Sequence, residues 1–123
     1  SPLHERFSYH VPGALDFALM QRAARLLLGR HDFSAFGKPP AGHNPVREIL
    51  QSDWWQDGRM WLYRVEANAF LWRMVRRLVM ALIWVGQKRW TTAQLASVLA
   101  AQDLAMAPPP APAKGLFLWQ VNY

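Results

Sequence analysis

Three arginines stand inside a long apolar run, and their side chains are suited to bind an anion. They are Arg73, Arg76 and Arg77, within the stretch from Asn68 to Gly86. A guanidinium group keeps its charge and presents a planar fork of donors that fits phosphate and carboxylate oxygens. The net charge of +6 has two interpretations, a polyanionic partner or a basic domain whose charge only aids solubility.

The spacing of apolar residues predicts that this run is an amphipathic helix from about Ala69 to Gly86. At about 100° per residue, one side collects Leu71, Met74, Val75, Leu78, Leu82 and Val85, and the other collects Arg73, Arg76, Arg77, Met80 and Trp84. The second side is either solvated, with arginine stems lying along the surface, or covered by another domain, another subunit or RNA. Met80 and Trp84 favour a covered face, because both side chains are large and apolar.

Other kinds of site find little support. The chain has no cysteine, which excludes thiolate metal sites and cysteine nucleophiles and fits a cytoplasmic location. Its four histidines lack metal-ligand spacing, so we expect no metal. The sequence also has neither a glycine-rich phosphate loop nor a Ser-His-Asp signature. Asp32 is either a catalytic carboxylate or, more commonly for Asp in a turn, an acceptor of backbone hydrogen bonds. The three arginines argue against a membrane span in the only long apolar run.

Secondary-structure signals predict a single domain over residues 1–123. The expected elements are a strand at 7–11, a helix between Asp16 and Gly29, a loop at 38–45, strands at 46–54 and 59–70 around the turn Asp57-Gly58, the helix at 69–86, a helix capped by Thr91 or Thr92, a Pro-rich segment at 105–113 and a strand at 114–123. The inward stripes are Phe17, Met20, Ala24, Leu27 and Leu28 in the first helix and Leu95, Val98 and Leu99 in the last. This order is that of the split βαβ, or ferredoxin-like, α+β fold, in which helices cover one face of an antiparallel sheet.

Five segments spread over nearly the whole chain form an ordered set of motifs. They are Gly29-Arg-His-Asp-Phe-Ser-Ala-Phe36, Val46-Arg-Glu-Ile49, Ala67-Asn-Ala-Phe-Leu-Trp-Arg-Met-Val-Arg76, Val85-Gly86 and Ala111-Pro-Ala-Lys-Gly-Leu-Phe-Leu-Trp-Gln-Val-Asn-Tyr123. In order and spacing this set resembles the tRNA pseudouridine synthase A family, and specifically the C-terminal half of its members.

The resemblance implies an enzyme that isomerises uridine to pseudouridine in the anticodon stem-loop of tRNA, without cofactor or metal. It further implies two related halves whose sheets join around a basic cleft, and a homodimer. The family's catalytic Asp lies in an Arg-Thr-Asp motif of the N-terminal half, and no such motif occurs in this sequence. We therefore expect the chain alone to be inactive, with the missing N-terminal half and tRNA as its partners.

Matching the family residue by residue gives Arg76 the leading role. It corresponds to the Arg of Met-Val-Arg, which in the family pairs with the catalytic Asp. A cation beside such a carboxylate keeps it ionised and oriented. Leu116, or alternatively Leu118, matches the apolar residue beneath the target base, whereas Phe33 and Phe36 are expected to pack in the core.

Four more residues are expected to bind RNA, namely Asn68, Arg47 and His43 along its path and Arg77 at a phosphate. Met80 departs from the family, which usually has Gly here, and this puts the local packing of the helix in doubt. An alternative function is a non-catalytic ferredoxin-like RNA-binding module that contacts only phosphates. A third is a domain that serves dimerisation.

Overall fold

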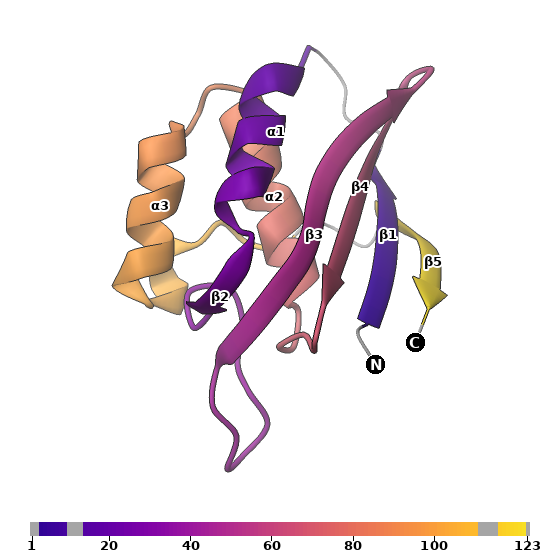
Figure 1. Cartoon of the computed structure of the whole chain (residues 1–123). Helices are drawn as coiled ribbons and strands as arrows, with labels where there is room; N and C mark the ends of the chain where they lie inside the picture. Colours follow the sequence, from indigo (N-terminus) through magenta and orange to yellow (C-terminus); the bar gives the residue numbers. More distant parts are fainter. Residues whose placement is uncertain (1–2, 10–13, 111–115, 123) are drawn as a thin grey trace.

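A five-stranded antiparallel sheet carries three helices on one face (Figure 1). The computed structural model describes residues 3–9, 14–110 and 116–122, the first and last of these segments by their backbone. The elements in chain order are β1 (Leu3–Tyr9), α1 (Phe17–Leu26), β2 (Gly29–Asp32), β3 (Val46–Asp57), β4 (Met60–Ala67), α2 (Met74–Gly86), α3 (Thr92–Ala101), the 3-10 turn η1 (Leu104–Met106) and β5 (Leu116–Asn122).

The strands lie in the order β2-β3-β4-β1-β5, and every neighbouring pair is antiparallel. Without β2, this is the strand order of the split βαβ fold, so the predicted fold class is confirmed. Strand β1 begins earlier than expected, at Leu3, and pairs with both β4 and β5. Residues 10–11, 114–115 and 123 of the two predicted terminal strands lie outside the described residues.

Hydrogen bonding lengthens the predicted hairpin at its turn. Strand β3 continues to Asp57, whose partner in β4 is Met60, so Gly58 and Arg59 alone make the connection. Strand β4 ends at Ala67 rather than Phe70. Beyond β2, the outer edge of β3 is met by helix α1: the backbone N–H of Trp54 donates a hydrogen bond of 2.7 Å to Oε1 of Gln21.

Strand β2 was not predicted, and its four residues explain why. Gly-Arg-His-Asp has no apolar alternation, and a run this short carries no periodic signal. The strand exists because it pairs with the start of β3, from Gly29 opposite Ile49 to Asp32 opposite Val46. Gly29 has φ +97°, a backbone conformation that suits glycine and turns the chain from α1 into the sheet.

Helices α1 and α3 agree with the prediction. Asp16 caps α1, since its Oδ1 accepts a hydrogen bond of 3.0 Å from the N–H of Leu19. Thr91 caps α3 through a capping box with Gln94. The inward stripe of α1 is wrong at its two ends, because Phe17 and Leu28 are 42% and 40% exposed.

Helix α2 begins at Met74, five residues later than predicted. Residues 70–72 are instead held beside the loop that follows β2, where the N–H of Trp72 donates 3.3 Å to the carbonyl of Lys38. Arg73 therefore precedes the helix as its N-cap residue, in a left-handed conformation with φ +60°. The predicted core residues of the helix are buried, as are Val79, Ala81 and Ile83. Helix α2 is thus covered on more sides than a simple amphipathic helix, because it also contacts α1 and α3.

The capping box predicts a specific stability difference between two adjacent threonines. Replacing Thr91 with alanine removes the acceptor for the N–H of Gln94, and we expect a loss of about 1 kcal/mol in the free energy of unfolding. Thr92→Ala, one position into the helix, should change it by less than about 0.5 kcal/mol. Urea titration of both variants measures the difference, and equal losses would contradict the capping role.

Candidate functional site

Five of the expected functional residues lie at one end of the sheet, where β4 passes into α2 and β3 begins: His43, Arg47, Asn68, Arg76 and Arg77. Leu116 does not, because it pairs with Tyr9, which lies opposite Trp61 at the start of β4. We call residues 68–77 the β4–α2 junction. Its central part is fixed by a close approach: a Cβ built on Gly37 would lie 2.7 Å from Cβ of Leu71 and 2.9 Å from the carbonyl oxygen of Trp72. No larger residue fits at Gly37 without displacing the junction, so this contact sets where its arginines lie.

Asn68 opens the junction and has a structural role. Its Oδ1 accepts hydrogen bonds of 2.9 Å from the backbone N–H groups of Glu48 and Ala69. Its own N–H donates 3.1 Å to the carbonyl of Glu48. Asn68 thereby extends the pairing of β3 with β4 past the end of β4, and its side-chain oxygen is used within the protein.

Arg47 and His43 lie on the neighbouring segment that leads into β3. Nη1 of Arg47 donates hydrogen bonds of 2.7 Å to the carbonyls of Asn44 and Val46, and its Nε is buried without a partner. Arg47 therefore braces the start of β3. His43 is exposed in the loop at 38–45, where its backbone N–H donates a hydrogen bond to the carbonyl of Pro40.

The three arginines are close in sequence but differ in setting. Arg73 is exposed on the loop, and its guanidinium carbon lies 4.2 Å from the centroid of the Trp72 ring. The prediction that placed it on a helical face is wrong, because the helix has not yet begun. Arg76 and Arg77 lie in the first turn of α2 and are partly buried, as are Met80 and Trp84 further along. The predicted second face of the helix thus exists from Arg76 onward.

Positive charge accumulates at this turn. Burial, and after it the charges of Arg73 and Arg76, lower the pKa of Arg77. The first turn of α2 contains no acidic residue, and the N-terminus of a helix itself disfavours cations. The seven residues from Phe70 to Arg76 also line a cavity of about 320 Å³. The arrangement suits an anionic group supplied from elsewhere.

Leu116 and Leu118 belong to β5 at the edge of the described sheet, where their backbones pair with Tyr9 and Phe7. The structure describes only the backbone of β5, so the expected place of these two side chains beneath a base stays a prediction.

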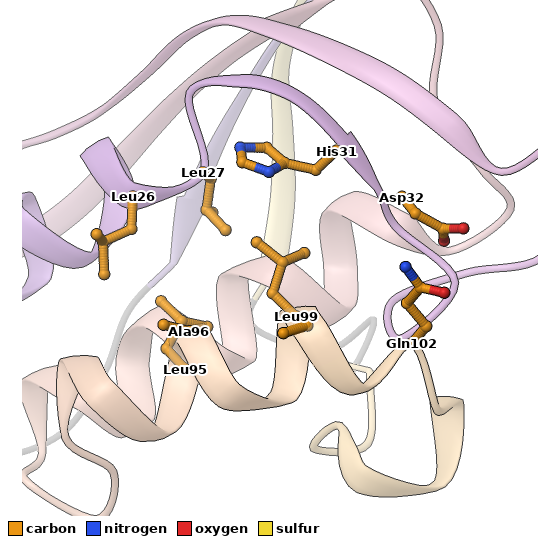
Figure 2. A pocket seen from close by; sticks show the side chains of 9 residues that line it. Leu26, Leu27, His31, Asp32, Leu95, Ala96, Leu99 and Gln102 are labelled. Atoms are coloured by element: carbon orange, nitrogen blue, oxygen red, sulfur yellow. The ribbon is translucent and has the colours of Figure 1, made fainter.

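A second cavity, of about 340 Å³, lies between the end of α1, β2 and α3 (Figure 2). Leucines from both helices line it together with His31 and Asp32. Nε2 of His31 is 2.8 Å from the carbonyl of Leu28, and Oδ1 of Asp32 accepts 2.8 Å from the N–H of Ser34. Asp32, the last residue of β2, therefore accepts a backbone hydrogen bond, which is the more common of the two roles considered for it. Sequence patterns contain no signal for this cavity, because one of its walls is β2, which periodicity does not predict.

Two kinds of site are absent from the part of the chain that the structure describes. It holds no cluster of three or more His, Cys, Asp or Glu side chains that could bind a metal ion. Within the same residues, none of the helices combines the length and apolar character that crossing a bilayer requires.

Residues 23–123 match the family model described as tRNA pseudouridine synthase. Because the match covers most of the chain, the chain belongs to that family, and the resemblance found in its motifs is confirmed.

Individual relatives bear the more specific description tRNA pseudouridine synthase A. The protein of Methylacidiphilum infernorum is 38% identical over 99% of this chain and 49% of its own length. The protein of Acidiphilium cryptum is 40% identical over 98% of this chain and 48% of its own length. The protein of Chloroflexus aurantiacus is 44% identical over 93% of this chain and 43% of its own length. The chain thus spans about half the length of the curated relatives it matches.

The crowding of like charges predicts a salt-dependent effect of Arg77. Arg77→Met removes repulsion from Arg73 and Arg76, so we expect the free energy of unfolding to rise by about 0.3–0.5 kcal/mol at low salt. At 1 M NaCl, where the screening length is about 3 Å, the electrostatic part of the gain should vanish. Denaturant titrations at the two salt concentrations measure it.

Arg89→Met is the matched control. Arg89 is exposed beyond the C-terminal end of α2, where a cation is favoured, and it stacks on Trp84 at 4.0 Å. This variant should lose stability rather than gain it. A loss of stability at low salt in Arg77→Met as well would contradict the repulsion inferred for the junction.

Proposed function

We propose that this chain is the C-terminal half of a tRNA pseudouridine synthase that isomerises uridine in the anticodon stem-loop. The observation that carries the proposal is the family match over residues 23–123. In the reaction the bond between N1 and the ribose C1′ breaks and a bond between C5 of the same uracil and C1′ forms. C5 loses its proton and N1 gains one, so atoms and electrons balance without an external oxidant, reductant or group donor. The chemistry accordingly requires a positioned carboxylate and a place for the detached base rather than a cofactor.

Arg76 supplies the cation for that carboxylate. It stands in the first turn of α2, partly buried, at the cavity of the β4–α2 junction. In a partly desolvated site, a guanidinium lowers the pKa of an adjacent carboxyl group and fixes its orientation. The catalytic Asp comes from the N-terminal half, which joins this chain to form the complete site. Arg76 then keeps the carboxylate of the Asp ionised while this carboxylate attacks the uridine.

The remaining residues divide the work of holding RNA. Leu116 or Leu118 contacts the target base from β5, and Arg77 meets a phosphate. His43 is exposed and contacts the RNA directly. Asn68 and Arg47 are engaged with backbone groups, so they act mainly by fixing the loops along which the RNA runs.

The complete enzyme is a cytoplasmic homodimer that contains both halves. The 123-residue chain alone should therefore form no pseudouridine in tRNA, because it lacks the nucleophilic carboxylate. Mixing or fusing it with an N-terminal half that carries the Asp should restore turnover. Pseudouridine formation by the chain alone, measured on a bulk tRNA substrate, would refute this division of the site.

Arg76 gives a sharper test in the complete enzyme. Arg76→Ala should lower kcat by about 100-fold or more, the scale found when one stabilising donor is removed, while binding of tRNA weakens only slightly. Arg89→Ala, at the far end of α2, is the control and should leave both unchanged. Equal losses in binding and turnover for Arg76→Ala would favour the non-catalytic RNA-binding module instead.

A further inference from the structure

Trp72 is the most exposed of the exposed large apolar side chains among residues 14–110. Its exposed fraction is 62%, and the next highest is 49%, at Met106. A single exposed apolar residue is ordinary, so its exposure alone indicates no site. What distinguishes Trp72 is how it is held and what surrounds it.

The backbone on both sides of Trp72 is fixed by the fold. Its N–H bonds to the carbonyl of Lys38, and its carbonyl oxygen is crowded by Gly37. The flanking Leu71 is 3% exposed, and Met74 is fully buried. These anchors turn the indole outward, so its exposure is a property of the folded junction.

Arg73 adds a charged group in a strained conformation. Its φ of +60° is unfavourable for a residue other than glycine, and such strain is concentrated at functional sites. Its guanidinium lies against the indole, 4.2 Å from the ring centroid. A stacked guanidinium keeps its in-plane N–H donors available to a phosphate.

The surroundings favour an anionic ligand with an aromatic part. Arg76 and Arg77 follow within one turn, and the same charges that lower the pKa of Arg77 attract a phosphate. The cavity of about 320 Å³ that Trp72 helps to line extends from Phe70 to Arg76. Its volume lies in the range of small-ligand pockets.

We infer that Trp72 and Arg73 form a stacking platform for one unpaired nucleotide of the RNA substrate, with the base on the indole and its flanking phosphate at the guanidinium. The inference rests on the proposed function, since it places this nucleotide beside the target uridine. An unpaired base fits the platform because bases within a duplex are already stacked on their neighbours. The competing occupant is the N-terminal half of the synthase itself, which the test separates from RNA.

The test compares a labelled hairpin RNA that has an unpaired loop with a fully paired duplex of similar length, by fluorescence anisotropy. Both the 123-residue chain and the same chain joined to its N-terminal half are measured. Trp72→Ala should weaken hairpin binding about tenfold, as expected for loss of one stacked base, and leave duplex binding within about twofold. Trp72→Tyr should retain most of the affinity, because it keeps an aromatic face.

Two glycine substitutions separate strain from binding. Arg73→Gly and Lys88→Gly each replace an exposed cation in the left-handed region, at φ +60° and +62°. Both should raise the melting temperature, because glycine adopts this conformation without strain. Only Arg73→Gly should weaken hairpin binding and reduce its salt dependence, because Lys88 lies at the opposite end of α2.

Three outcomes would overturn the platform: equal effects of Trp72→Ala on hairpin and duplex, no effect on either, or an effect that disappears when the N-terminal half is joined. The proposed function is tested separately by turnover. Pseudouridine formation with an unchanged KM in Trp72→Ala would overturn the platform and leave the function intact. Hairpin-specific loss in a protein that modifies no tRNA would support the platform and refute the function.

Discussion

The close approach of Gly37 to Cβ of Leu71 and the carbonyl oxygen of Trp72 is the constraint on which the candidate site depends. It joins the loop that follows β2 to the chain leaving β4, and there is no room between them for a side chain. Helix α2 begins only after this crossing. The close packing of Gly37, which has no side chain, thus determines that Arg76 and Arg77 lie in α2 and that Arg73 precedes it.

Local signals predicted much of the fold because they act within a few residues. The caps at Asp16 and Thr91 and the Asp-Gly hairpin each depend on neighbours in the sequence, and all were found. The failures are at β2 and at the start of α2. Both are determined by partners far along the chain, β3 in one case and Lys38 in the other, and periodicity carries no information about such partners.

The candidate site shows the same contrast between features set by nearby residues and features set by distant ones. Helical spacing separated Arg76 and Arg77 from the core side of α2, and the structure agrees. It could not indicate that Arg73 stacks on Trp72, since that geometry arises from a left-handed residue outside the helix. The side-chain roles of Leu116 and Leu118 came from family resemblance alone. The prediction makes Asn68 and Arg47 RNA contacts, yet both side chains bond to backbone groups. The bond of Asn68 to Glu48 follows from the register of β3 and β4, whereas Arg47 bonds to Asn44 and Val46 just before it in the chain.

The hydrogen bond from Trp54 to Gln21 has a consequence for how the sheet can grow. Unpaired edge amides are templates for the addition of another strand. On the β3 side, β2 pairs with the first part of the edge, and the side chain of Gln21 occupies an amide beyond it. On the opposite side, β5 has no further neighbour among the described strands. Addition of a strand to the β3 edge is hindered, because the side chain of Gln21 already accepts from an amide that an added strand would need.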